Sequence, residues 1–88
     1  MPRMVFIHGV ADVDRWLEGK AERAAFFESI GADAKDYVAL DGSKQIAITA
    51  EVDDVEATQA VLASPPAEVA ALMQKHGVLP PVTIYIEK

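Results

Sequence analysis

The alternation of hydrophobic and polar residues divides the chain into four strand-like segments separated by helical ones. Each strand-like segment is a short apolar run or alternates with period two, and several of its residues are β-branched or aromatic. These segments are residues 4–9, 34–40, 45–52 and 82–88. The middle two are separated by Asp41-Gly42, a dipeptide that favours a hairpin turn. We therefore expect four strands, of which the second and third form a hairpin.

The first helical segment lies between the first two strands. Asp12 can cap it with its side chain, and we expect the helix to run to about Ile30 and to end at Gly31. On a helical wheel, a set of hydrophobic side chains shares one face. These side chains are Val13, Trp16, Leu17, Ala24 and Phe27. Lys20 lies near the middle of this face and Arg23 lies on its flank.

The second helical segment follows the third strand and is interrupted. Asp53 is the expected N-cap, with Glu56 three residues later to complete a capping box. Ser64-Pro65 breaks this helix and starts a third helical segment, which ends at His76-Gly77. In that third segment the i, i+3, i+4, i+7 spacing of one helix face is occupied by Val69, Leu72, Met73 and His76.

The order strand, helix, strand, strand, helix, strand is that of a ferredoxin-like βαββαβ plait. Such an α+β fold has a four-stranded antiparallel sheet with helices on one face, and here the second helix is broken near Ser64-Pro65. The 88 residues form a single domain, 1–88. The opposite sheet face lacks a cover, and 51% of the residues are hydrophobic. We therefore expect a homodimer through this face, which forms a dimeric α/β barrel.

Charge and composition narrow the class of partner. The formal net charge of −6 disfavours nucleic acid and anionic membrane surfaces, because both are themselves negatively charged. The chain has no cysteine and only two histidines, so we expect no disulfide and no metal site. Residues 1–10 lack the apolar length and cleavage site of a signal peptide, and no apolar stretch approaches the length of a membrane helix. We expect a cytoplasmic protein with no cofactor and no nucleic-acid or membrane partner.

Cationic and titratable residues lie among the hydrophobic positions of the predicted helices. In one interpretation Lys20 and Arg23 lay their stems on apolar surface and keep their charges in water, and His76 caps a helix C-terminus. In the other, they line a cleft between helices and sheet that is apolar apart from a few polar groups. Such a cleft would bind a small aromatic or anionic molecule, with Lys20 or Arg23 stabilising an oxyanion.

The direction of the strands brings His8 near some of these residues. If neighbouring strands are antiparallel, one edge of the domain holds His8, Trp16 and His76. Two imidazoles can act as general acid and base near neutral pH, so His8 and His76 are the candidate catalytic residues. The candidate ligand-binding residues are Trp16, Lys20, Arg23, Phe27 and Leu72. The alternation leaves open whether His8 faces the helices or the dimer side, and we expect it to hydrogen-bond Thr83 or a backbone carbonyl of the neighbouring strand.

Three stretches of the sequence resemble a known superfamily. The stretch "HGVADVDRW" resembles the opening "H-x-V-x-D-(aromatic or apolar)-D-x-W" of small dimeric α/β-barrel proteins, the antibiotic biosynthesis monooxygenase-like superfamily. In this opening His8, Asp12 and Trp16 match the motif. The stretch "EVDDVEATQAVLASPP" resembles the superfamily's acidic pair, helix and Ser-Pro break, and "GVLPPVTIYIE" resembles its closing strand.

The resemblance implies a dimer that packs two sheets together and a ligand cleft between helices and sheet. The superfamily includes cofactor-free quinone-forming monooxygenases, haem degraders, isomerases and dehydratases. The Asn, Trp and His set of the haem degraders is not evident, and Lys20 and Arg23 stand where an aromatic residue and often a histidine are expected. The leading hypothesis is therefore a small-molecule protein, in its specific form a cofactor-free monooxygenase-like enzyme. The alternative is a non-catalytic dimeric ligand-binding or accessory module.

Overall fold

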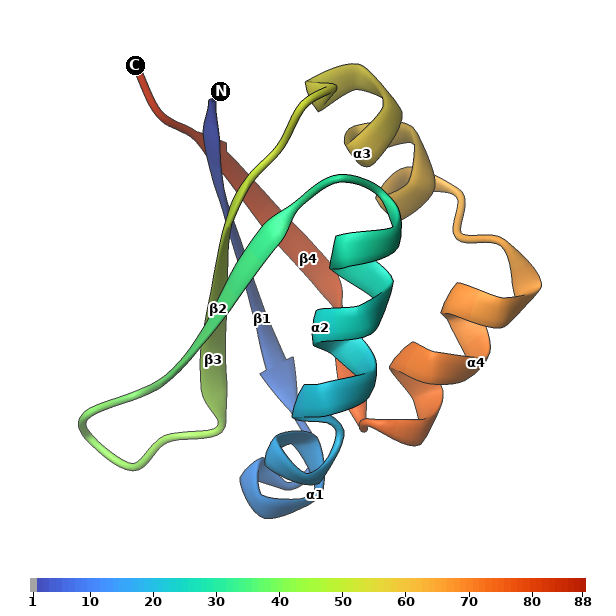
Figure 1. Ribbon diagram of the computed structural model, residues 1–88. Helices are drawn as coiled ribbons and strands as arrows, with labels where there is room; N and C mark the ends of the chain where they lie inside the picture. Colours follow the sequence, from blue (N-terminus) through green and yellow to red (C-terminus); the bar gives the residue numbers. More distant parts are fainter. Residues whose placement is uncertain (1) are drawn as a thin grey trace.

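The computed structural model describes residues 2–88 and confirms the predicted ferredoxin-like α+β fold. The strands are β1 (Arg3–Val10), β2 (Asp33–Val38), β3 (Gln45–Glu51) and β4 (Val78–Ile86). The helices are α1 (Val13–Glu18), α2 (Lys20–Ser29), α3 (Val55–Ala63) and α4 (Ala67–Lys75). The strands form one antiparallel sheet in the order β2-β3-β1-β4, and α2, α3 and α4 cover one of its faces (Figure 1).

The core lies between the sheet and the helices, and alternation within β1 and β3 builds its floor. The buried positions of these strands are Met4, Phe6, His8, Val10, Ile46, Ile48 and Ala50. From the helical layer Trp16 and Phe27 complete the core, and the rings of Phe27 and Phe6 lie 5.9 Å apart between centroids. Because His8 shares its face of β1 with Phe6, it points toward the helices and not toward the uncovered side of the sheet.

The first helical segment is two helices, α1 and α2, because the chain turns at Gly19. The backbone of Gly19 lies directly against the imidazole of His76, where any Cβ would overlap the ring. Because of this turn, the residues after Gly19 do not face the directions that one continuous helix would give them. Lys20 is exposed as a result, whereas the Arg23 residue is only 6% exposed. The prediction that Lys20 lies on the inner face is therefore wrong, and Arg23 is the cation that faces the sheet.

The helix caps are partly those expected from the sequence. Asp12 caps α1 as predicted, because its carboxylate accepts hydrogen bonds from two backbone amides of the first turn. Helix α3 is capped by Asp54, whose carboxylate accepts from the amide of Ala57 at 3.0 Å. The predicted capping box from Asp53 to Glu56 is therefore wrong by one residue.

The break between α3 and α4 falls where it was predicted, near Ser64-Pro65, but its details differ. Ser64 ends α3, and Pro66 is the N-cap of α4 without a side-chain hydrogen bond, so Ser64 does not cap the second of these helices. Gly77, with φ of 74°, follows α4 as predicted. No residue of α4 is fully buried, so this helix is less deeply buried than α2, which contributes Arg23 and Phe27 to the buried residues.

An irregularity in the sheet lies beside His8. Strand β4 begins before the predicted residue 82 and contains Pro80-Pro81, neither of which has an amide hydrogen to donate. The pairing of β1 with β4 shifts its register between Ile7 and Gly9, opposite these prolines. His8 therefore lies at a point where the β1–β4 ladder is interrupted, near the end of its strand.

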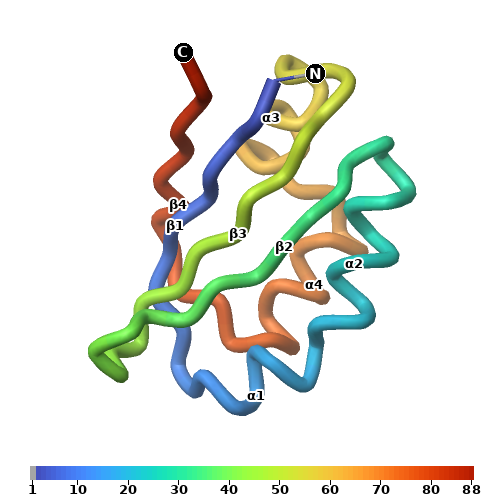
Figure 2. The backbone as a smooth tube through the Cα atoms, turned by 60° about the vertical axis from the view of Figure 1, so that its left-hand side comes forward, coloured from blue at the N-terminus to red at the C-terminus, as the bar shows by residue number. Residues whose placement is uncertain are grey.

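The second face of the sheet carries no helix (Figure 2). Val5 lies beside Tyr85 of β4, and Ile7 lies beside Ala47 of β3 on this face. Tyr37 and Tyr85 are 47% and 57% exposed, so a substantial apolar surface is open on this side of the single chain. Within residues 2–88, none of the helices has the length and apolar character needed to span a bilayer.

Candidate functional site

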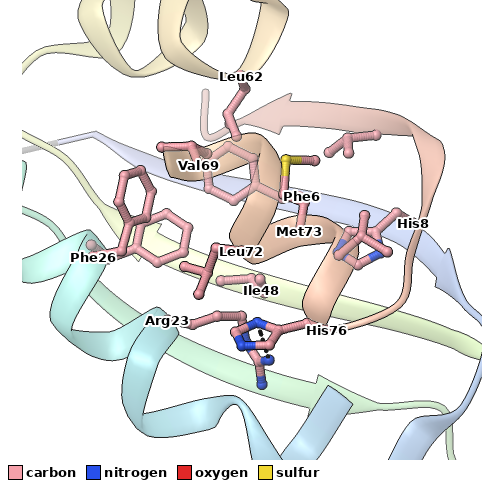
Figure 3. A pocket seen from close by; sticks show the side chains of 13 residues that line it. Phe6, His8, Arg23, Phe26, Ile48, Leu62, Val69, Leu72, Met73 and His76 are labelled. Carbon is pink, nitrogen blue, oxygen red and sulfur yellow. Dashed lines mark hydrogen bonds between the residues drawn. The ribbon is translucent and has the colours of Figure 1, made fainter. Parts of the chain in front are cut away.

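A cavity of about 60 Å³ lies between the sheet and the helical layer. Most of its wall is apolar, including Phe6 and Ile48 from the sheet and Leu72 from α4, and its polar members are His8, Arg23 and His76. In Figure 3, Arg23 and His76 lie together at one end, while apolar side chains of α3 and α4 lie at the other. The hollow is therefore an apolar pocket with a polar end.

Arg23 is the centre of the polar end. Its Nη2 lies 3.3 Å from Oδ2 of Asp36, and the two side chains are 7% and 8% exposed, so they form a buried ion pair. Its Nη1 donates to the backbone carbonyl of Trp16 and to Nδ1 of His76, the latter at 3.2 Å. The guanidinium carbon lies 3.9 Å from the centroid of the Trp16 ring, which is the geometry of a cation–π contact. These contacts hold the cation in one orientation.

His76 is fixed by groups on three sides and its ring orientation can be deduced. A guanidinium can only donate, so the Nδ1 atom facing Arg23 accepts and the proton of the neutral ring is on Nε2. That Nε2 lies against Gly19 and 3.8 Å from the carboxylate of Glu22, away from the cavity. Arg15 donates to the carbonyls of the two residues before His76, at 2.7 and 2.8 Å, and holds the end of α4. His76 therefore positions Arg23 and does not present a proton to the pocket.

His8 has the opposite tautomer. Its Nδ1 lies 2.8 Å from the carbonyl oxygen of Gly9, which can only accept, so Nδ1 carries the proton. Nε2 of the neutral ring then has a free lone pair, and within residues 2–88 it has no hydrogen-bond partner. The expected partners were Thr83 or a neighbouring strand, and the observed one is the next residue of the same strand. The ring meets Trp16 edge-on, with centroids 6.4 Å apart.

Burial keeps both imidazoles neutral near pH 7. Loss of solvent lowers the pKa of His8, and the charge of Arg23 lowers it further, although the bond to Gly9 opposes the shift. Loss of solvent and the charge of Arg23 also lower the pKa of His76, against the opposing effect of Glu22. His8 is therefore in the form that accepts a proton, and the Arg23 cation that lines the same cavity would stabilise a negative charge on a bound molecule.

Several buried donors in this region have no partner among residues 2–88. They are Nε1 of Trp16, Nε of Arg23 and Nε2 of His76. A buried N–H without an acceptor costs about 1–3 kcal/mol, so unpaired donors are uncommon in folded proteins. Of the residues that carry these donors, Arg23 and His76 line the cavity, whereas Trp16 does not. A ligand with a hydrogen-bond acceptor therefore suits this end of the pocket.

The structure brings together most of the residues proposed from the sequence. His8, Arg23, Phe27, Leu72 and His76 all line the cavity. Lys20 does not line it, because it is exposed after the turn at Gly19. Trp16 is also absent from the wall, being fully buried behind Arg23 and His8, where it supports both. The interpretation in which Arg23 keeps its charge in water is wrong, because its guanidinium is buried.

Asp36 is the residue of this cluster that sequence reasoning missed. It shares its face of β2 with Ala34, so period-two alternation alone places a carboxylate on the inner side of an edge strand. A carboxylate that faces the core needs a cationic partner, because an unpaired buried charge is costly. This requirement could have indicated from the sequence that Asp36 pairs with a buried cation. Within residues 2–88, no group of three or more His, Cys, Asp or Glu side chains is arranged to hold a metal ion.

Comparison with known proteins identifies the fold through solved structures. No model of a protein family matches the chain, and no curated protein matches it. A "putative antibiotic biosynthesis monooxygenase" from Bordetella bronchiseptica aligns with a TM-score of 0.75 and 11% identity, over 99% of this chain and 94% of that one. A protein with the same description from Deinococcus radiodurans gives a TM-score of 0.59 and 13% identity, over 100% and 91% of the two chains.

A crystal structure of a protein from Arabidopsis thaliana is also similar, with a TM-score of 0.54 and 17% identity over 100% of this chain and 94% of that one. At such low identities the similarity defines the fold and leaves the activity open. The resemblance proposed from the sequence is confirmed at this level. The chain has the ferredoxin-like fold of two structures that are each described as a "putative antibiotic biosynthesis monooxygenase".

Proposed function

We propose that the protein binds a small aromatic molecule bearing an oxygen atom in the cavity between helices and sheet, and oxidises it as a cofactor-free monooxygenase-like enzyme. The observation that carries this proposal is the pairing of a neutral His8, whose Nε2 lone pair is free, with the buried Arg23 at one end of an apolar cavity. An apolar wall suits an aromatic ring, and the polar end suits its hydroxyl group.

The chemistry follows from these two side chains. Nε2 of His8 would accept the proton of a phenolic hydroxyl, and the guanidinium of Arg23 would stabilise the resulting oxyanion. The electron-rich ring then reacts with dioxygen at the free para carbon. One oxygen atom enters the quinone product and the other leaves as water, so one phenol and one dioxygen give one quinone and one water. His76 keeps Arg23 in position for this step.

Oxygen uptake with a phenol that has a free para position, such as 1-naphthol, tests the proposal. The wild-type protein should consume one dioxygen per quinone formed, without an added cofactor and above the rate in buffer. His8→Gln should lower the rate by about 10²–10⁴-fold, the usual contribution of a general base. Lys20→Met is the matched control and should retain the full rate, because Lys20 is exposed. Equal rates for wild type and His8→Gln would refute this assignment of the base.

The alternative function, a non-catalytic ligand-binding or accessory module, is favoured by two observations. The cavity of about 60 Å³ is small, and Asp36 already neutralises Arg23. A protein that binds 1-naphthol with a measurable Kd but consumes no dioxygen would support this alternative.

We also propose that two copies of the chain pair through the uncovered sheet face. The support is the apolar surface around Val5, Ile7, Tyr37 and Tyr85, together with the high hydrophobic content of so short a chain. Light scattering should then give about twice the 9.5 kDa chain mass at micromolar concentration. Placing a charge at the face with Tyr85→Lys should shift the mass toward that of one chain, and a monomeric wild-type protein would exclude the pairing.

A further inference from the structure

A second hollow lies on the outer side of the cavity wall. It is an open groove of about 660 Å³ between α3, α4 and β4. Four apolar residues line both this groove and the inner cavity, so they form the partition between the two spaces. These residues are Leu62, Met73, Val78 and Val82. Figure 3 shows Met73 and Leu62 extending from the helical layer into the cavity beside Phe6.

The inner cavity is too small for an aromatic ligand as it stands. A cavity of roughly 150 Å³ is known to bind benzene, whereas this one has a volume of about 60 Å³. Binding of an aromatic ring therefore requires one wall to move. Phe6, Phe27 and Ile48 are 2–5% exposed and belong to the densely packed core, so their side of the cavity resists displacement.

The opposite wall, on α4, is softer. No residue of α4 is fully buried, and Met73 is an unbranched side chain with several rotatable bonds. A change of the Met73 rotamer would move one of the four partition residues without a shift of the backbone, and would widen the connection between the groove and the inner cavity.

The residues along the groove indicate what would occupy it. Ala70 of α4 lines the groove together with Pro80, Pro81 and Ile84 of β4. Among the described residues, none that lines the groove is charged. The polar groups are the neutral amides of Gln59 and Gln74. By contrast, 25% of the whole chain is charged. An uncharged apolar chain suits this surface, and an ionic or strongly polar group does not.

We infer that the ligand is elongated: a phenol-like head at Arg23 and His8, and an alkyl tail that passes Met73 into the outer groove. Met73 is the gate between the two spaces and determines which tails are accepted. This inference rests on the proposed function, because it uses the same polar end. It adds the chemical class of the ligand, the route of its tail and a residue that determines specificity.

The test is the affinity of a series of 4-alkylphenols from methyl to octyl, measured by isothermal titration calorimetry. Their para carbon is substituted, so they serve as binding probes that the proposed reaction does not consume. For the wild-type protein, each methylene that enters the groove should tighten binding about fourfold, the factor that corresponds to about 0.8 kcal/mol per buried methylene. Ala70→Trp fills the groove and should abolish this dependence, while 4-methylphenol binds as before. Ala71→Trp is the matched control on the same helix, because Ala71 is exposed and should leave the whole series unchanged.

The gate is tested separately with Met73→Ala, which should tighten binding of the octyl compound more than that of the methyl compound. If 4-methylphenol binds but affinity does not rise with tail length, the inference is wrong and the proposed function stands. The same conclusion follows if the dependence survives Ala70→Trp, since the tail then lies elsewhere. If no member of the series binds, the inference and the aromatic ligand of the proposed function both fail.

Discussion

Arg23 and Asp36 form a buried ion pair, and we expect that replacing either residue alone lowers the free energy of unfolding much more than replacing both together would suggest. Breaking a buried ion pair by removing one partner costs about 3–5 kcal/mol, because a charge is left in the interior without compensation. With side chains only 7% and 8% exposed, solvent screens this pair weakly. Arg23→Met and Asp36→Leu should therefore each lower the free energy of unfolding by about 3–5 kcal/mol.

The double variant should be much less destabilised than the sum of the two single ones. It leaves no buried charge, and its cost is limited to the lost contacts of Arg23 with Trp16 and His76. We expect a coupling free energy of about 3 kcal/mol, the upper range for residues in one network. The matched control is Lys20→Met, which replaces an exposed cation of the same helix and should change stability by no more than about 0.5 kcal/mol.

Urea unfolding followed by the fluorescence of the single tryptophan measures these free energies directly, because Trp16 is fully buried in the folded state. Far-UV circular dichroism should give coincident transitions and so exclude a purely local change around the indole. Single variants that lose less than about 1 kcal/mol would refute the account of a buried charge pair, because surface ion pairs contribute no more than that. Strict additivity in the double variant would also refute it.

Three further results are expected. Gly19→Ala should lower the free energy of unfolding by about 1–3 kcal/mol, because its Cβ would overlap the His76 ring. In a His76→Ala background the same change should lower the free energy of unfolding far less, which thermal unfolding of the four proteins measures. Both histidines have a pKa below the ordinary value, so their neutral forms stabilise the fold above the unfolded pKa of about 6.5, and this stability is lost as the pH falls below it. The Tm should accordingly fall between pH 7 and 5.5, less steeply in His8→Gln and His76→Gln, and an unchanged slope would contradict these shifts. Arg15→Met should lower the Tm by loosening the end of α4 that Arg15 holds, whereas Lys44→Met should not.

The sequence was sufficient for the fold because its signals are local. The alternation of Ile46, Ile48 and Ala50 and the turn at Asp41-Gly42 define the hairpin without reference to distant residues. The position of Lys20 was not predictable in the same way. Gly19 is an ambiguous signal, because an isolated glycine can end a helix or be tolerated within one, and the close packing of His76 against it comes from a residue distant in sequence.

The candidate site was predictable in composition but not in geometry. His8 and His76 could be placed at one edge of the domain, but the face occupied by His8 depends on the register of β1 within the sheet. The role of Arg23 depends on Asp36, which comes from another strand, and on the proton donors and acceptors around His76. Such pairings are tertiary contacts between residues far apart in the chain, and they cannot be identified from the pattern of a single sequence.

The central claim is that His8 and Arg23 form the polar end of a ligand-binding cavity. The most direct test is a titration of ¹⁵N-histidine-labelled protein with 4-methylphenol, observed through the ring nitrogens at pH 7.5. The account predicts a free protein in which His8 carries its proton on Nδ1, and saturable binding that shifts Nε2 of His8 as it accepts a hydrogen bond from the phenol. The ring nitrogens of His8 remaining unchanged while 4-methylphenol binds, or His8 carrying its proton on Nε2 in the free protein, would contradict it.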